Sequence, residues 1–333
     1  MAKGSSKFGK YKERKVREAL RNPINVLKSL SEKSQEKSYK YQRLYRNLYN
    51  PEFYLLAYQN IYANKGSMTP GVDGMTIDGI SMARINRIIE SMRNQSYQPK
   101  PARREYIKKK TGNKKRPLGI SSADDKLVQE VVRMILESIY EGSFSVKSHG
   151  FRPNKSCHTA LIQIRKTFTG AKWFVEGDIK ACFDSFDHAV LIRILRKRIE
   201  DEVFLNLICK FLKAGYMEQW TFNKTYFGIP QGSGCSPILA NIYLNELDEF
   251  MQELKDKFDV GDCNRRIVSY EYESVRGRAK RLKKKYAKDW NEVSEEERNR
   301  RAKEIRELRA IYTKLPRYEA RDENFKKIQY TRY

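Results

Sequence analysis

One segment of the sequence predicts a long helix with a single apolar face. Between about residues 123 and 140, large apolar side chains recur every four positions, at Leu127, Val131, Ile135 and Ile139. This spacing places them on one side of an α-helix, and other parts of the chain must cover that side. Further helices are predicted at about residues 76–93, 156–168, 189–200, 202–214 and 236–256, and a weakly amphipathic one at 16–49.

Two further segments predict β-hairpins between these helices. Residues 106–120 form two strands around Thr111–Gly112–Asn113, a turn sequence surrounded by cations. Residues 217–229 form another pair that turns at Asn223–Lys224 and carries aromatic side chains in its strands. In addition, residues 172–177 have the length and apolar content of a buried strand.

The last part of the chain has a different character. Residues 268–315 are strongly charged and helical in pattern, and Ser294 with Glu297 forms a capping box that opens a helix. Their apolar residues are sparse, which favours a solvated helical insertion over a core element. Residues 325–333 then alternate like a strand with no turn or cap after them, so we expect the domain to continue beyond Tyr333.

Positive charge is the strongest feature of the composition. The 67 Lys and Arg residues against 41 Asp and Glu give a formal net charge of +26, and residues 1–50 hold 14 against 4. This balance predicts a polyanionic partner, with nucleic acid favoured over the alternative of a merely soluble basic protein. A membrane partner is not predicted, because no run approaches the ~18 apolar residues that span a bilayer.

The cysteines and histidines do not form the pattern of a zinc domain. The five cysteines are scattered without a Cys-x-x-Cys pair, and there are only three histidines. An odd number of scattered thiols in a chain of 333 residues is typical of a reducing compartment, so we expect a cytoplasmic location.

Three stretches carry side chains suited to chemistry, and the first is the cationic hairpin. From Lys109 to Arg116, cations lie on both arms of the predicted turn. They can close over a triphosphate, with arginine as a bidentate donor and lysine as a point charge. A generic basic hairpin without a specific ligand is the alternative.

The second stretch places carboxylates after the predicted strand at 172–177. Asp178 follows that strand directly, at the rim of a sheet where a hard cation can bind. Asp184 and Asp187 are further possible ligands, but capping of the next helix is the preferred interpretation for both. Asp178 has no such structural role.

The third stretch is the Gly-rich loop from Gly228 to Pro237. Its three glycines let the backbone approach a substrate closely, and the loop presents its amides at a helix N-terminus. Ser236 is a natural N-cap, and Pro237 suits the first helical position. A plain connection between strand and helix is the alternative.

Together and in this order, the three stretches resemble the reverse transcriptases. GIPQGSGCSPILANIYL, at 228–244, is similar to the family's PQG-x-x-x-SP-x-L-x-N-x-x-L block. FVEGDIKACFDSFDH, at 174–188, resembles the first catalytic-aspartate block, and KKKTGNKKRPLGI, at 108–120, resembles the fingers block.

Two more blocks resemble the group II intron branch of this family. They are SHGFRPNKSCHTAL at 148–161, with its G-F-R-P motif, and NKGSMTPGVDGMTI at 64–77, with its G-V-D-G motif. The resemblance covers about residues 45–250 and resumes at 325–333.

The resemblance implies an α+β, right-hand polymerase fold with fingers and an incomplete palm, whose antiparallel sheet is backed by helices. It implies a helix-rich basic extension at 1–48, fingers at 49–170 and the palm at 171–333. The palm would include the hairpin and Gly-rich loop at 216–235, near the nucleotide pocket, and a basic helical insertion at 260–318.

The resemblance also implies roles for individual residues at the nucleotide pocket. Lys109 and Arg116 match the positions that grip the phosphates of the incoming nucleotide. Phe183 matches the steric gate, whose ring clashes with a 2′-hydroxyl and so selects deoxynucleotides. Gln231 matches a position that lines the pocket. Core packing is the alternative for Phe183.

For the metal, the resemblance implies Mg²⁺ in a two-ion site. Asp178 matches the first metal-binding, catalytic aspartate, and the carbonyl of Ile179 would add a ligand. Tyr333 matches the tyrosine of the block in which two further aspartates follow. We therefore expect the chain as given to lack polymerase activity, because two-metal phosphoryl transfer needs several carboxylates.

RNA contacts are expected from cations of the extension and the hairpin. These residues are Lys40, Arg43, Arg46, Lys108, Lys110, Lys114 and Lys115. Tyr39, Tyr41 and Tyr45 lie among the first of them, a mixture of rings and cations that RNA-binding proteins use. A packed helix face is the alternative for the three tyrosines.

The implied function is that of the RNA-directed DNA polymerase of a mobile group II intron, which also acts as a maturase in splicing and retrotransposition. The implied partners are intron RNA, an RNA template with a DNA primer, and deoxynucleoside triphosphates. Exposed palm surface would also allow a homodimer. An RNA-binding module alone, or another bacterial reverse transcriptase of the retron or diversity-generating type, are the alternatives.

Overall fold

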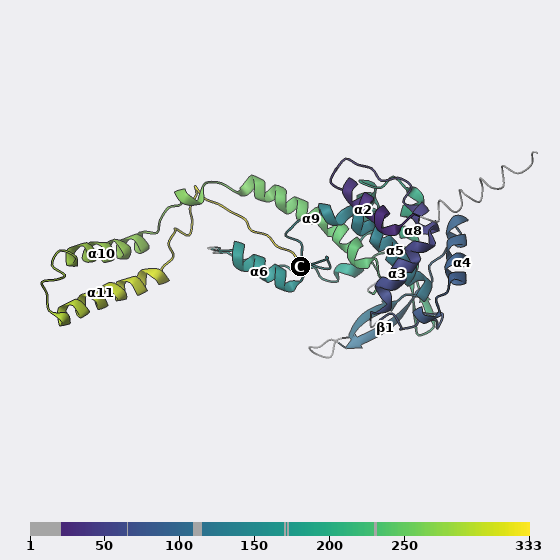
Figure 1. Cartoon of the computed structure of the whole chain (residues 1–333), viewed down its shortest axis with the longest axis horizontal. Helices are drawn as coiled ribbons and strands as arrows, with labels where there is room; N and C mark the ends of the chain where they lie inside the picture. Colours follow the sequence, from purple (N-terminus) through teal and green to yellow (C-terminus); the bar gives the residue numbers. More distant parts are fainter. Residues whose placement is uncertain (1–20, 65, 109–114, 170, 172, 230–231) are drawn as a thin grey trace, which may run out of the picture. The chain divides into compact units, whose positions relative to one another are not determined.

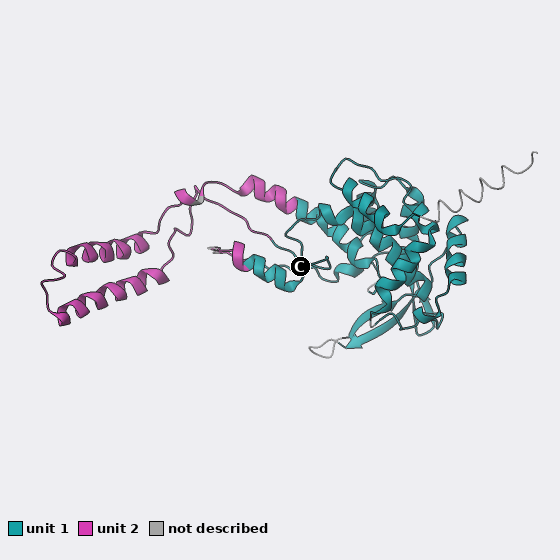
Figure 2. Ribbon diagram, in the orientation of Figure 1, with its two compact units in different colours: residues 1–164, 176–249, 331–333 teal, residues 165–175, 250–330 magenta. Residues whose placement is uncertain are grey.

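The computed structural model describes residues 21–333 apart from 65, 109–114, 170, 172 and 230–231. The chain divides into two compact units, shown in Figure 2. Unit 1 comprises residues 1–164, 176–249 and 331–333, and unit 2 comprises residues 165–175 and 250–330. None of the helices in the described ranges is long and apolar enough to cross a membrane.

Unit 1 is built around helix α5 (Ala123–Tyr140), labelled in Figure 1. The side chains of Leu127, Val131, Ile135 and Ile139 are fully buried, which confirms the predicted apolar face. Helices α2 and α3 both pack against α5. Seven of the described helices contribute to this core: α2 (Pro23–Lys33), α3 (Pro51–Tyr62), α4 (Met82–Arg93), α5, α7 (His188–Arg196), α8 (Glu202–Lys213) and the first turns of α9 (Ser236–Phe258).

The segment that precedes α3 differs from the single helix predicted at 16–49. Helix α2 ends at Lys33, and a 3₁₀ helix occupies η1 (Tyr45–Tyr49). Between them the chain is irregular, and Tyr41 forms a parallel bridge with Ile199. The buried Tyr41 also donates its hydroxyl to the carbonyl of Leu30 at 2.8 Å. Pairing with a distant segment therefore replaces the intrahelical hydrogen bonds that the sequence pattern indicated.

A four-stranded sheet of order β2-β1-β3-β4 lies in the same unit. Strands β1 (Ala102–Lys108) and β2 (Lys115–Ile120) form the predicted cationic hairpin. Strands β3 (Tyr216–Glu218) and β4 (Thr221–Asn223) form the second hairpin. Both hairpins are antiparallel as expected, but β1 and β3 join them in parallel, so the sheet is mixed.

The second hairpin turns earlier than the sequence predicts. Gln219 and Trp220 connect β3 to β4 with φ angles of 48° and 63°, instead of a turn at Asn223–Lys224. Two consecutive residues with positive φ make the type of two-residue turn that matches the twist of paired strands. The pairing of Glu218 with Thr221 therefore fixes a turn at two residues that neither Gln nor Trp would suggest.

The buried strand predicted at 172–177 is wrong for the described part of that segment. Residues 173–177 are irregular, and Trp173, Phe174 and Val175 are 81%, 66% and 93% exposed. A strand exists only where another strand pairs with it, and the described residues supply no pairing to this segment. Apolar content alone therefore does not make it a strand.

Helix α9 (Ser236–Phe258) begins where the Gly-rich loop ends, as predicted. Its first turns bury Ile238, Leu239 and Ile242 in the core of unit 1. Shorter elements complete the described chain: η2 (Ile77–Gly79), η3 (Glu141–Ser143), α6 (Cys157–Thr167), η4 (Cys182–Asp184) and η5 (Cys263–Arg265).

Unit 2 contains a pair of charged helices, α10 (Tyr270–Tyr286) and α11 (Glu295–Lys314), that pack on each other. Ser294 caps α11 by accepting a hydrogen bond from the amide of Glu297 at 3.4 Å, as the capping box predicted. Within the two helices, only Ala279 and Leu308 are buried. The segment is therefore helical and solvated, as predicted.

Candidate functional site

A cavity of about 590 Å³ in unit 1 brings the three chemically suited stretches together. Lys108 and Arg116 of the cationic hairpin line one part of it. Phe183, from the second stretch, and Gly232, from the Gly-rich loop, line others. The volume lies within the range of pockets that bind small organic ligands. Segments far apart in the sequence therefore meet around one ligand-sized space.

Two cations face each other at the end of the described part of the hairpin. Lys108 lies directly opposite Lys115, and Ile107 lies opposite Arg116. Like charges facing each other across a strand pair repel, and a bound polyanion would relieve that repulsion. Lys108, Lys115 and Arg116 are exposed. The other predicted hairpin cations, Lys109, Lys110 and Lys114, lie outside the described residues.

Phe183 connects the cavity to the core. It is half-buried in η4, and its ring centroid lies 6.2 Å from those of Phe151 and Phe186, edge-on in both cases. Phe186 in turn lies 4.6 Å from Tyr243 of α9. Phe183 therefore has packing contacts and also forms a wall of the cavity, so its position is compatible with a gate and with a core residue.

Gly228 and Gly232 fix the Gly-rich loop against the two other stretches. Gly228 has φ of +88°, and a Cβ there would lie 2.8 Å from the carbonyl oxygen of Phe183. Its amide donates to the carbonyl of Phe186 at 2.8 Å. Gly232 has φ of +108°, and a Cβ there would lie 2.5 Å from the carbonyl oxygen of Gly119 in β2. Side chains at either position would push the loop away from the cavity.

The loop is also tied to helix α5. The amide of Gly234 donates to Oε1 of Gln129 at 3.0 Å, and the same side chain bonds to Ser121. Gln129 is itself buried. The predicted pocket residue Gln231 lies outside the described residues.

Asp178 and Ile179 lie in an irregular, exposed segment before η4. The negative charge of Asp178 acts on Cys182, whose thiol pKa is raised mainly by burial and also by this carboxylate, while Arg332 lowers it. In the described ranges no group of three or more His, Cys, Asp or Glu is placed to hold a metal. Mg²⁺ is often held by one or two carboxylates together with substrate phosphates and waters, so Asp178 fits as one ligand of such a site.

Asp184 and Asp187, the two other acidic residues of this stretch, have different positions relative to the next helix. Asp187 caps α7 by accepting from the amide of Val190 at 2.9 Å, as predicted. Asp184 lies inside η4 and lines a second cavity, so the capping role preferred for it is wrong. The three-residue spacing of a cap places only Asp187 at the start of the helix.

A buried polar cluster around Arg332 was missed from the sequence. Arg332 pairs with Asp248 at 2.7 Å and donates to the hydroxyl of Ser148 at 2.7 Å. It also donates to Asn241, which binds the carbonyl of Gly150 at 2.9 Å. This cluster fixes the last residues of the chain beside the G-F-R-P stretch. A polar position within the buried face of α9 was the available signal.

The predicted RNA-contacting cations near the N-terminus have different surroundings. Lys40 donates its ammonium to the carbonyls of Arg196 and Lys197, at 3.4 and 2.8 Å, at the end of α7. Arg43 and Arg46 are exposed. Among the three tyrosines, Tyr41 and Tyr45 are buried and Tyr39 is half-buried, which is the packed arrangement.

Comparison with known proteins gives matches over most of the chain. Residues 107–270 match the family model described as reverse transcriptase (RNA-dependent DNA polymerase). The group II intron-encoded protein LtrA of Lactococcus lactis subsp. cremoris is 47% identical over 315 residues, which cover 94% of this chain and 51% of that protein. The chain thus spans about half the length of this relative.

Other similar proteins also have names that refer to introns. An uncharacterized 91 kDa protein in the cob intron of Schizosaccharomyces pombe is 47% identical over 72% of this chain and 30% of its own length. Nuclear intron maturase 2, mitochondrial, of Arabidopsis thaliana is 32% identical over 40% of this chain and 24% of its own length. A chain of a Cas6-RT-Cas1–Cas2 complex matches 75% of this chain and 43% of its own at 19% identity, with a TM-score of 0.41, too distant to add to the assignment.

Proposed function

The chain belongs to the group II intron-encoded branch of the reverse transcriptase family, whose α+β fold is that of right-hand polymerases, and from this premise we propose that it serves RNA-directed DNA synthesis. We propose further that the same protein is a maturase, which binds its own intron RNA for splicing and retrotransposition. In this scheme residues 1–48 are a basic extension, residues 49–170 are the fingers and residues 171–333 belong to the palm.

The cavity of about 590 Å³ is the observation that carries the polymerase proposal. In the proposed complex it holds the incoming deoxynucleoside triphosphate. Arg116, with Lys109, binds the phosphates, because guanidinium and ammonium groups are the usual phosphate ligands. By the family resemblance, Phe183 would lie under the sugar, and Gln231 would be a residue that lines the nucleotide pocket.

Reverse transcriptases generally use divalent metal ions, and we propose Mg²⁺ for this protein. Asp178 and the carbonyl of Ile179 would contribute oxygen ligands, with the triphosphate supplying others. When bound, such an ion stabilises the negative charge that develops during phosphoryl transfer. In this proposal, the segment before η4 supplies the carboxylate of Asp178 to the metal ion, and the cationic hairpin positions the triphosphate.

Replacement of Asp178 tests the metal proposal. In the full-length protein, Asp178→Ala should abolish DNA synthesis on a primed RNA template and leave RNA affinity almost unchanged, because it removes a metal ligand and no phosphate contact. Primer extension and RNA binding are measured side by side. A matched loss of RNA affinity, or synthesis at the unaltered rate, would refute this role of Asp178.

Replacement of Phe183 tests the sugar gate. In the full-length protein, Phe183→Val should raise ribonucleotide incorporation relative to deoxynucleotide incorporation, because the smaller side chain leaves room for the 2′-hydroxyl. Phe250→Val is the control, since Phe250 lies exposed on α9 and lines neither cavity. If Phe183→Val discriminated as strictly as the control, Phe183 would be a packing residue only.

RNA recognition near the N-terminus is tested by point changes, because deletion of residues 1–48 would remove the core residues Tyr41, Leu44 and Leu48. Arg43→Gln with Arg46→Gln should weaken binding of intron RNA more than binding of a random RNA of equal length. Each lost phosphate contact should also reduce the dependence of log K on log salt by roughly 0.7–0.9. Equal losses on both RNAs would show that these arginines supply charge without recognition.

Self-association is a further proposal, because Trp173, Phe174 and Val175 expose large apolar side chains. Such surfaces tend to find a partner, and a second copy of the chain is the simplest one. Light scattering at high concentration should then give twice the chain mass of 39.3 kDa. A mass of one chain would refute the homodimer.

A further inference from the structure

A buried ion pair between Arg332 and Asp248 joins the last residues of the chain to helix α9. The guanidinium donates to both oxygens of the carboxylate, at 3.0 and 2.7 Å. The side chains of Arg332 and Asp248 are only 11% and 1% exposed. Such a two-pronged contact fixes the orientation of the guanidinium as well as its distance. Because burying two charges costs solvation free energy, the pair indicates a fixed geometry more than it indicates stability.

The guanidinium of Arg332 also reaches acceptors on two other segments. It donates to the hydroxyl of Ser148 at 2.7 Å and to the side-chain oxygen of Asn241 at 3.3 Å. The side-chain amide of Asn241 in turn donates to the carbonyl of Gly150 at 2.9 Å. Ser148 and Asn241 are both buried. These four residues and Asp248 form the Arg332 cluster, which ties α9 to the G-F-R-P stretch.

The backbone around Arg332 pairs with the same stretch. Ser148 and Arg332 form a parallel bridge, in which the amide of His149 donates to the carbonyl of Arg332 at 2.8 Å. The amide of Arg332 donates to the carbonyl of Lys147 at 2.9 Å. A short isolated strand pair is marginally stable by itself. The buried side chain of Arg332 therefore holds this pairing in register.

Helix α6 also contacts this stretch. The ring nitrogens of His149 lie 2.8 Å from the hydroxyl of Thr159 and 2.6 Å from the side-chain oxygen of Gln163. Both partners belong to α6, and His149 is buried. Residues 147–150 are therefore a fixed frame, and the side chain of Arg332 sets where the last residues of the chain lie against it.

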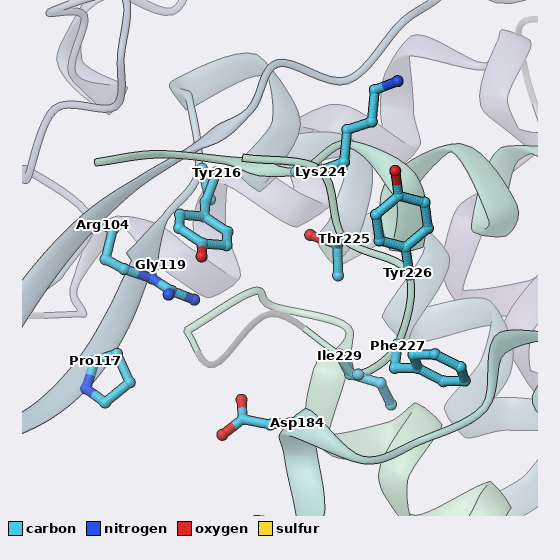
Figure 3. Close-up of a pocket in the computed structure, with 13 residues that line it drawn as sticks. Arg104, Pro117, Gly119, Asp184, Tyr216, Lys224, Thr225, Tyr226, Phe227 and Ile229 are labelled. Atoms are coloured by element: carbon cyan, nitrogen blue, oxygen red, sulfur yellow. The ribbon is translucent and has the colours of Figure 1, made fainter. Parts of the chain in front are cut away.

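The frame leads directly into the nucleotide pocket proposed above. Phe151 follows Gly150, lines that pocket and lies edge-on to Phe183. A Cβ at Gly150 would lie 3.1 Å from the carbonyl carbon of Tyr333, which is closer than an ordinary contact. The last residues and the wall of the pocket are therefore in close contact through Gly150. Among the described residues that line the second cavity, shown in Figure 3, none belongs to the Arg332 cluster.

We propose that Arg332 is a positioning residue for nucleotide transfer. Held by Asp248, it keeps the last residues in register with the frame and so fixes where Tyr333 and Phe151 lie. The two charged side chains do not touch the nucleotide in this scheme. Small displacements of aligned groups lower the reaction rate strongly, even when binding is kept. The inference rests on the proposed function, because Phe151 matters to the reaction only if the cavity holds the incoming triphosphate.

The test replaces the pair by apolar side chains of similar size, Arg332→Met with Asp248→Leu, in the full-length protein. Removal of one partner would leave a buried unpaired charge, whereas apolar replacement of both is often neutral for stability. On a primed RNA template, the double variant should lower kcat by on the order of 100-fold. The KM for deoxynucleoside triphosphates should stay unchanged, because the cations of the hairpin are intact. An unchanged kcat in the folded double variant would overturn the inference.

Arg84→Met with Asp124→Leu is the matched control. This ion pair joins α4 to the first turn of α5, and its side chains are 5% and 27% exposed. Neither residue lines either cavity. The control should therefore leave kcat unchanged. An equal loss of kcat in both double variants would show a general effect of removing a buried pair and would overturn the inference.

Arg332→Lys is a second variant, which leaves Asp248 with a cationic partner. Lysine supplies a point charge in place of the planar fork of arginine, so it cannot hold the same acceptors together. The kcat should fall by less than in the double variant, again with an unchanged KM. A kcat equal to that of the unaltered protein would contradict positioning by the guanidinium.

Hydrogen exchange tests the positioning without polymerase activity. In the chain of 333 residues, the amides of His149 and of residue 332 should exchange faster after Arg332→Met with Asp248→Leu, while exchange in α5 stays unchanged. Full protection of those two amides would show that the pair does not hold the register, and the inference would fail. Absence of DNA synthesis by the unaltered full-length protein would instead refute the proposed function, and with it the link from Arg332 to the reaction.

Discussion

Helix α5 and the α10–α11 pair are the two extremes of helix stabilisation in this molecule. Helix α5 buries thirteen of its eighteen residues, among them Leu127 and Ile135, and other helices pack around it. In α10 and α11, by contrast, one residue of each helix is buried. Helix α5 is stable because its apolar surface is buried away from water. The α10–α11 pair depends instead on contacts between charged and aromatic side chains at the surface.

Arg301 shows how the helix pair is held together. Its guanidinium pairs with Asp289 at 2.9 Å and with Glu297 at 2.8 Å. It also lies over the ring of Tyr286, 4.7 Å from the centroid. Exposed ion pairs contribute little individually, so networks that share one arginine are the more effective arrangement. The comparison therefore predicts a stable core and a helix pair that opens independently and responds to charge.

The largest expected effect is in the core. Ile135→Ala should lower the free energy of unfolding by about 2–5 kcal/mol, because it leaves a cavity among fully buried neighbours. Leu308→Ala in α11 should cost about 1–2 kcal/mol and should act on the helix pair alone. Denaturant unfolding, with hydrogen exchange to locate the change, measures both. If Ile135→Ala and Leu308→Ala lowered the global free energy of unfolding equally, the distinction between the core and the helix pair would be contradicted.

A smaller effect is expected from the ion-pair network. Arg301→Ala should speed hydrogen exchange throughout α10 and α11 and leave exchange in α5 unchanged. Arg309→Ala is the control, since it removes the same charge from an exposed position on the same helix. If both changes had the same effect, net charge and not the network would stabilise the pair.

The smallest expected effect is that of acid on stability, and its sign should differ between α5 and the α10–α11 pair. Hydrogen bonds from Arg301 lower the pKa of Asp289 and of Glu297 below the ordinary values of 3.8 and 4.5. The two carboxylates stabilise the folded state when the pH is above their ordinary pKa values. This stabilisation is lost as the pH falls through their lowered pKa values. The amides of the α10–α11 pair should therefore lose protection from hydrogen exchange, relative to the intrinsic rate at each pH, as the solution is acidified below about pH 4.

Asp125 in α5 should respond in the opposite direction. Burial raises its pKa, although hydrogen bonds from Tyr97, Ser122 and the amide of Lys100 oppose the shift. The folded state then binds a proton more readily than the unfolded state, so this contribution to stability grows as the pH falls through the raised pKa toward 3.8. Asp125→Asn should remove that contribution. If acid changed the stability of α5 and of the α10–α11 pair in the same direction, these roles of Asp125, Asp289 and Glu297 would be refuted.

Elements defined by local pattern could be predicted from the sequence. The face of α5 and the capping by Ser294 depend on residues a few positions apart, and both were correct. The strand predicted at 172–177 was wrong because a strand needs a pairing partner, which its own residues do not specify. The turn at Gln219–Trp220 likewise follows from the register of β3 with β4 and not from turn-forming residues.

The candidate site could be predicted in part. The motifs named Arg116 and Phe183, and both line the cavity of about 590 Å³. Phe151 lines it as well but was not singled out, since its place depends on a left-handed backbone conformation with φ of 53°. The cluster around Arg332 was missed because it joins segments more than eighty residues apart. Roles in catalysis and RNA binding stay predictions.

The proposed nucleotide pocket can be tested most directly through Arg116. In the full-length protein copying a primed RNA template, Arg116→Gln should raise the KM for deoxynucleoside triphosphates by about 10- to 150-fold, as expected for a lost charge-assisted hydrogen bond. Arg87→Gln, which removes an exposed cation of α4 away from both cavities, should leave that KM unchanged. An unchanged KM in Arg116→Gln, or an equal rise in both variants, would contradict the assignment of this cavity to the incoming nucleotide.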